Sequence, residues 1–229
     1  MPTPYEEVIA RAMTYIKNDR SLQFDLEQRL PVFYQRMLGY LTAARTLFNR
    51  PPEVLDRTAP GTEPFFARLL PDTAEGIPAG SPIAAGVTDC GLCCAGLLTE
   101  GEFGGMDYTP LPVAAYDPAA GTVTLGEAVE AGARLELCFY RSGSFAAQLT
   151  ETEQNILAYA LYSVWETRQA NDLLERKAKL RDSSFATISE ASQTQAATER
   201  LQLVEQRLRN MIREYELDAE YRRVVRSRE

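Results

Sequence analysis

The sequence of 229 residues contains no histidine. This absence excludes histidine-dependent catalytic triads, Cys/His nucleophilic sites and the most common metal ligand. No phosphate-binding loop of the GxxxxGK[ST] type is present either, and "GEFGG" at 101–105 lacks the strand-to-helix context of a dinucleotide-binding motif. We therefore expect a protein that is not an enzyme, with no catalytic residues and no cofactor.

Long apolar runs are also missing, and the N-terminal segment "MPTPYEEVIARAM" has neither a basic region nor an apolar core of the kind found in signal peptides. The sequence thus predicts no membrane association and synthesis in the cytoplasm.

Positive charge is absent from residues 70–133, although the whole chain carries 24 Lys and Arg residues and a formal net charge of −8. The acidic residues of this segment are Asp72, Glu75, Asp89, Glu100, Glu102, Asp107, Asp117, Glu127 and Glu130. A segment of this composition should repel the phosphates of nucleic acids, although an acidic surface also serves solubility alone. By contrast, Arg222, Arg223, Arg226 and Arg228 lie together near the C-terminus. We expect these arginines to contact another subunit or a partner protein.

Hydrophobic periodicity and turn composition divide the chain into three parts. Residues 1–70 carry helical patterns and form the N-terminal part of a helical body. Residues 71–146 hold short apolar segments separated by Gly and Pro, which is typical of a small β-rich domain. Residues 147–229 are helical again and end in the basic tail. The predicted fold is α+β: a helical bundle body with an inserted antiparallel β-sandwich or barrel.

Local signals place several element boundaries. Thr3 with Glu6, and Thr150 with Glu153, have the spacing of capping boxes at helix starts. Residues 49–80 are rich in Pro, Gly and Thr and are expected to form a long connection. The helical pattern breaks near "RDSSFATISEAS" at 181–192, so two long helices should pack antiparallel.

Two apolar stripes define the expected core faces of the helices. The stripe of the second helical pattern consists of Phe33, Met37, Leu41, Ala44 and Phe48. The stripe of the helix after Thr150 consists of Ile156, Leu157, Ala160, Leu161 and Val164. Tyr159, Tyr162 and Trp165 widen this second stripe. They could complete the core of one subunit or contact a second subunit, and we list them as interface candidates.

Cysteine is the one residue type whose positions in the sequence suggest a possible metal or redox site. Cys90, Cys93 and Cys94 lie together in "DCGLCC", and Cys138 lies in the predicted strand "LELCFY". A Cys-x-x-Cys spacing suits zinc or redox chemistry, but a second such pair is missing and cysteine is often simply buried. We predict buried side chains and no metal, with a structural metal as the alternative.

The second half of the chain resembles a known protein family in the order of its features. The strands "TVTL" and "LELCFY" are followed by "RSGSF", by the apolar helix "LTETEQNILAYALYSVWE" and by "SSFATISEASQTQ" before a long closing helix. This order is similar to that of the neck proteins of tailed bacteriophages, the connectors and adaptors between portal and tail. The resemblance implies a helical body with a small β-domain and no enzymatic activity.

The resemblance also implies partners and a location. Such a protein would form a homo-oligomeric ring, expected to be a dodecamer, that binds the portal on one side and tail or other neck proteins on the other. Its lumen would be a passive DNA conduit without sequence-specific binding, and its place would be the virion neck. The alternative is a cytosolic ligand- or peptide-binding module with a helical oligomerisation region.

Overall fold

The computed structural model describes residues 1–17, 19–28, 30–100, 106–180 and 188–226. The chain separates into two compact units. The helical unit comprises Met1–Asn18, Met37–Gly61 and Ser144–Glu229, and the sheet unit comprises Asp19–Arg36 and Thr62–Gly143. Their composition bears out the predicted α+β class, with helices from both ends of the chain and antiparallel sheets from its centre.

The described helices follow the predicted patterns, with two additions, the second and the fourth helix along the chain. They are α1 (Tyr5–Met13), α2 (Arg20–Gln28), α3 (Leu30–Leu47), α4 (Glu53–Arg57), α5 (Glu151–Leu180) and α6 (Ile188–Arg226). All five residues of the predicted stripe are buried, four of them in α3 and the fifth, Phe48, directly after it. Helix α2 was not predicted, because its sequence "RSLQFDLEQ" has few apolar residues to show a period.

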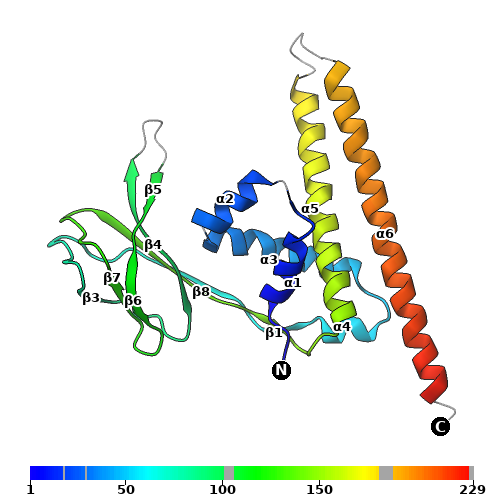
Figure 1. Cartoon of the computed structure of the whole chain (residues 1–229), viewed down its shortest axis with the longest axis horizontal. Helices are drawn as coiled ribbons and strands as arrows, with labels where there is room; N and C mark the ends of the chain where they lie inside the picture. Colours follow the sequence, from blue (N-terminus) through cyan, green and yellow to red (C-terminus); the bar gives the residue numbers. More distant parts are fainter. Residues whose placement is uncertain (18, 29, 101–105, 181–187, 227–229) are drawn as a thin grey trace. The chain divides into compact units, whose positions relative to one another are not determined.

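The helices α5 and α6 form a long antiparallel pair, as the sequence predicted (Figure 1). Glu153 near the start of α5 contacts Tyr215 in the second half of α6, whereas Glu166 farther along α5 contacts Arg200 in the first half of α6. The reversed order of these contacts establishes the antiparallel direction. The predicted break in the helical pattern falls largely on residues 181–187, which lie outside the described residues.

The strands form two main sheets and one short pair. They are β1 (Pro60–Thr62), β2 (Phe65–Leu69), β3 (Pro82–Ala84), β4 (Gly91–Glu100), β5 (Met106–Pro110), β6 (Val113–Asp117), β7 (Thr122–Leu125), β8 (Arg134–Arg141) and β9 (Ser144–Phe145). One sheet has the order β2-β8-β4-β5 and the other β3-β7-β6, with antiparallel pairing throughout these two sheets. Strands β1 and β9 pair with each other.

An apolar core joins the two main sheets, as in a small β-sandwich. Leu135, Leu137 and Phe139 alternate along β8 and point into this core, where they meet Val123 and Leu125 of β7. This alternation has the period of two that a strand with one buried face requires. The opposite face of β8 carries Glu136, Cys138 and Tyr140.

Residues 49–80 are not only the long connection that the sequence predicted. They contain α4, β1 and β2, and β2 pairs along its length with β8. The segment "PFFARLL" is too short to show alternation by itself, so tertiary pairing decides its conformation. The predicted domain limits of 1–70, 71–146 and 147–229 stay a prediction, and the compact units differ from them mainly because Asp19–Arg36 belongs with the sheets.

Candidate functional site

The junction before α5 is fixed by a reciprocal cap. The backbone N–H of Thr150 donates to Oε2 of Glu153 over 2.6 Å, and the N–H of Glu153 donates to Oγ1 of Thr150 over 3.3 Å. This is the predicted capping box, which satisfies two backbone donors at the start of the helix. It determines where α5 begins.

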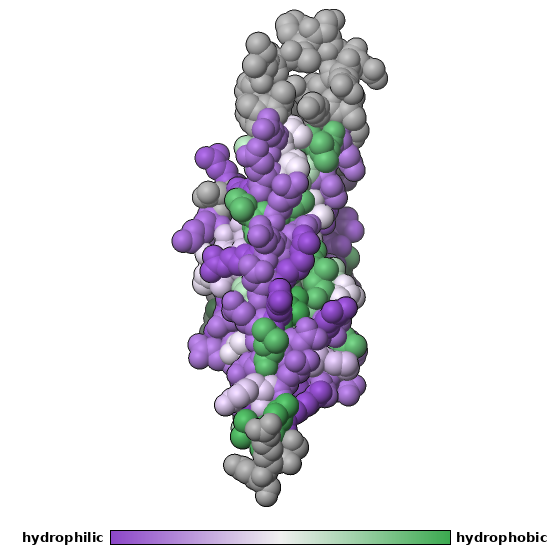
Figure 2. Space-filling model, turned by 90° about the vertical axis from the view of Figure 1, so that its right-hand side faces the viewer, coloured by the Kyte–Doolittle hydropathy of each residue, from purple (hydrophilic) through white to green (hydrophobic). Residues whose placement is uncertain are grey.

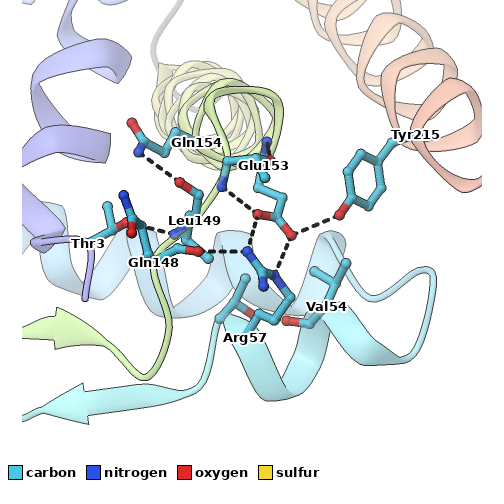
Figure 3. A network of polar contacts seen from close by, with 10 residues as sticks. Thr3, Val54, Arg57, Gln148, Leu149, Glu153, Gln154 and Tyr215 are labelled. Atoms are coloured by element: carbon cyan, nitrogen blue, oxygen red, sulfur yellow. Dashed lines mark hydrogen bonds and ion pairs between the residues drawn. The ribbon is translucent and has the colours of Figure 1, made fainter. Parts of the chain in front are cut away.

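Glu153 is also the centre of a buried network (Figure 3). Its side chain has no exposed surface, and its carboxylate accepts hydrogen bonds from Nε and Nη2 of Arg57 at 2.7 and 2.9 Å. The hydroxyl of Tyr215 donates to Oε1 over 2.8 Å, and Arg57 donates further to the backbone oxygen of Gln148 over 2.6 Å. The network therefore links α4, α5, α6 and the segment before α5.

These contacts shift the pKa values of the groups involved. Burial by itself would raise the pKa of Glu153, but hydrogen bonds from Arg57, Thr150 and Tyr215 outweigh it and the pKa is lowered. Burial and the hydrogen bond to Glu153 raise the pKa of Tyr215 to about 12. Glu153 is thus held as a carboxylate and Tyr215 as a neutral donor.

Thr3 does not cap α1 as the sequence predicted. The first helix begins at Tyr5 after an extended Pro4, and no side chain caps it. Thr3 is buried, and its hydroxyl oxygen accepts the backbone N–H of Leu149 over 2.8 Å (Figure 3). Its backbone exchanges hydrogen bonds with Phe145 and Ala147. The prediction is wrong because a long-range partner takes the hydroxyl that a local cap would use.

A second buried glutamate lies farther along α5. Glu166 accepts the hydroxyl of Tyr162 over 2.8 Å and both Nε and Nη2 of Arg200, at 3.0 and 2.7 Å. Burial and the hydrogen bond to Glu166 raise the pKa of Tyr162 to about 12. Each of the two glutamates therefore binds one arginine and one tyrosine. Glu153 joins α5 to α4 and α6, and Glu166 joins α5 to α6.

The three aromatic interface candidates belong to a row of rings in the helical unit. Tyr159 and Trp165 are buried, and Tyr162 is half-buried. Tyr162 stacks on Trp165 with ring centroids 5.9 Å apart and on Tyr15 with centroids 5.8 Å apart. Arg207 of α6 lies 5.3 Å above the Tyr159 ring. Within this chain, these rings thus pack α5 against the segment after α1 and against α6.

The arginines near the C-terminus make contacts within the chain. Arg222 pairs with Asp218 one turn earlier, and Arg223 pairs with Glu53 of α4, all at exposed positions. The side chain of Arg226 and the whole of Arg228 lie outside the described residues. A role of the four arginines between subunits stays a prediction.

Apolar side chains are exposed on the outer surface of α6. Leu203 and Tyr221 have 67% and 70% of their surface exposed, and Leu217 and Val224 are exposed by half or more. Figure 2 shows apolar side chains scattered among polar ones on this side of the molecule. A groove of about 850 Å³ lies between α3, α5 and α6 and is lined by residues that include Leu47, Val164 and Ile212. The helical unit thus offers apolar surface that its own packing does not cover.

The cysteines occupy two different environments. Cys90 is buried in the sandwich core, whereas Cys94 and Cys138 face each other across β4 and β8. The side chain of Cys93 lies outside the described residues. In the part of the chain that the structure describes, no group of three or more Cys, Asp or Glu side chains is placed to hold a metal ion. None of the described helices has the length and apolar character needed to cross a membrane.

Comparisons with models of protein families, with curated proteins and with solved structures found no match for this chain. Sequence reasoning missed Arg57 and Arg200, whose partners Glu153 and Glu166 lie 96 and 34 residues away. The only available signal was the presence of glutamate on the apolar side of a helix, where an unpaired carboxylate would be costly.

Proposed function

We propose that the protein is a non-enzymatic structural component of a tailed-phage virion. It forms a homo-oligomeric ring in the neck and joins the portal to the tail or to other neck proteins around a passive DNA conduit. Assembly takes place in the host cytoplasm. The order of motifs in the second half of the chain suggests this function, and two properties of the fold support it.

The observation that carries the proposal is the charge of residues 70–133, which form most of the sheet unit. Residues 70–133 contain no Lys or Arg, and each of their eight described acidic residues is exposed. None of the eight takes part in the ion pairs found among the described residues. A conduit wall of this kind repels phosphate, so DNA slides past it, whereas a basic wall would bind the duplex by counterion release.

The uncovered apolar surface of α6 supports the oligomeric part of the proposal. Exposed large side chains that recur along one helix are suited to contact with a neighbouring subunit. A ring requires such contacts to be heterologous, with one patch of each subunit binding a different patch of the next. The groove between α3, α5 and α6 is a second patch on the same unit.

The alternative function, a ligand- or peptide-binding module, depends on a cavity in the sheet unit. This cavity has a volume of about 290 Å³ and is lined by Leu26, Leu30, Tyr108 and Val113, among others. It is at the lower end of the size range of small-molecule sites. A binding module of this kind would stay monomeric or dimeric whether or not a portal protein is present.

Oligomeric state separates the two functions. Mass photometry and negative-stain images of the purified protein, alone and mixed with a portal ring, should show closed rings of about twelve copies. A monomer that joins no portal at any concentration tested would contradict the neck function.

A further inference from the structure

The register of the sheet brings two cysteines into direct opposition. Cys94 of β4 pairs with Cys138 of β8 in an antiparallel ladder. Directly opposed residues in such a ladder have Cα atoms about 4.5 to 5.5 Å apart. A disulfide needs Cα atoms roughly 4.4 to 6.8 Å apart, so the backbone is already within the required range.

An irregularity in β4 selects which cysteine takes this position. Leu92 pairs with Phe139 and Cys94 pairs with Cys138, so the register shifts by one residue between them. The extra residue of this bulge is Cys93. Without the bulge, Cys93 would stand opposite Cys138.

The two sulfur atoms differ in access. Cys138 is 5% exposed, whereas Cys94 is half-buried and borders the cavity of about 290 Å³ in the sheet unit. Tyr108 and Glu27 line the same cavity. A small reactant that enters this cavity therefore reaches Cys94 before Cys138.

The neighbours of the pair suit thiol chemistry. The thiol of Cys138 donates a hydrogen bond to Oε1 of Glu136 over 3.1 Å, and Arg68 of β2 pairs with the other carboxylate oxygen. The contact with Cys138 lowers the pKa of Cys94 to about 7, although burial of the Cys94 side chain opposes this shift. About half of the Cys94 side chains are therefore thiolate at pH 7, and the thiolate is the reactive form of cysteine.

We propose that Cys94 and Cys138 form a redox-active dithiol that low-molecular-weight disulfides convert into a cross-strand disulfide. The Cys94 thiolate attacks one sulfur of the small disulfide, forms a mixed disulfide and releases one small thiolate, which takes a proton from water. The thiol of Cys138 then loses its proton to water as its sulfur attacks Sγ of Cys94. This step breaks the mixed disulfide and releases the second small thiolate. Two protein thiols are oxidised, and one small disulfide is reduced to two thiols.

The reaction is independent of the proposed neck function and can be tested on the full chain. Trypsin leaves Cys90, Cys93 and Cys94 on one peptide because residues 70–133 contain no Lys or Arg, so the test uses variants. The C90A/C93A variant keeps only Cys94 and Cys138. After incubation with oxidised glutathione and alkylation, its intact mass should show no alkylated thiol, no bound glutathione and the loss of two hydrogens.

The matched control is the C90A/C94A variant, which keeps Cys93 and Cys138 and carries the same number of substitutions. It should form no internal disulfide at the same oxidant concentration. Absence of the link in C90A/C93A, or equal formation in both variants, would overturn the proposal. If a variant fails to fold, tandem mass spectrometry of the disulfide-linked tryptic peptides from the unsubstituted protein identifies which cysteine is linked to Cys138. A link through Cys90 or Cys93 would contradict the proposal.

The order of attack is tested by two single variants. Cys138→Ser should retain glutathione on Cys94, because the second step cannot occur. Cys94→Ser should react with oxidised glutathione at least tenfold more slowly at any remaining cysteine. Faster modification of Cys138 than of Cys94 would overturn the assignment of Cys94 as the attacking thiol.

Discussion

The hydroxyl of Tyr215 donates a hydrogen bond to the buried carboxylate of Glu153 over 2.8 Å. The two residues are 62 positions apart, and they fasten α6 to the first turn of α5. Replacement of Tyr215 by Phe should lower the free energy of unfolding by about 1.5 kcal/mol, because one hydrogen bond to a charged acceptor is lost. Urea unfolding measures this change. Tyr221→Phe is the matched control. Tyr221 is 70% exposed, so loss of its hydroxyl should not change the free energy of unfolding measurably.

The substitution Glu153→Gln removes the charge that Arg57 faces. Both hydrogen bonds from the guanidinium weaken, and the amide can no longer accept all the donors around it. We expect a loss of about 2 kcal/mol in the free energy of unfolding, a value limited by the partial exposure of Arg57. Glu151→Gln, at an exposed position in the same helical turn, should change stability little. Equal losses for the two variants would contradict the role of Glu153.

The contribution of Glu153 should depend on pH in a defined direction. Its pKa is lowered in the folded protein, so its contacts stabilise the fold fully above the unfolded-state pKa of about 4.3. As pH falls through the lower folded-state pKa, this stabilisation is lost. The stability difference between the unsubstituted protein and Glu153→Gln should thus be constant from pH 6 to 8 and should narrow toward pH 3. A difference that widens in acid would contradict the sign of the shift.

The backbone of Phe145 in β9 lies close to Gly61 in β1, so a side chain at position 61 should clash with it. A Cβ at this position would overlap the backbone carbonyl of Phe145. Gly61→Ala should therefore destabilise the protein by about 1 to 3 kcal/mol, measured as a shift in the urea midpoint. Gly39 in α3 has open space around it, so Gly39→Ala should instead stabilise by roughly 0.5 kcal/mol.

The exposed apolar residues of α6 supply a test of ring formation. The double variant L217S/Y221S removes apolar surface that the subunit does not use internally, so assembly should weaken while monomer stability stays the same. Sedimentation velocity with and without portal measures the assembled fraction. Gln206→Ser, an exposed polar change on the same helix, is the control. If L217S/Y221S assembles as well as the unsubstituted protein, Leu217 and Tyr221 are not part of the proposed interface.

The sequence predicted those elements that have a strong local signal. The stripe from Phe33 to Phe48 has a clear helical period, and the capping box at Thr150 is complete within four residues. Strand β2 and the role of Thr3 depend on partners at least 68 residues away, which local patterns do not encode. The same reason accounts for Arg57, whose function becomes visible only when α4 lies beside Glu153. The pairing of Cys94 with Cys138 depends on a bulge, and nothing in "DCGLCC" fixes which cysteine is the extra residue.

The contact between Tyr215 and Glu153 acts at one point of a very long helix. Helix α6 runs from Ile188 to Arg226, and at 1.5 Å per residue its start lies about 40 Å from Tyr215. A rotation of only 5° about this contact would therefore displace the start of the helix by roughly 3.5 Å. The precision with which this contact sets the direction of α6 therefore determines how precisely the start of the helix is positioned. A second contact, between Arg200 of α6 and Glu166 of α5, holds the helix nearer its start. Two contacts fix the direction of α6, which a single contact cannot do.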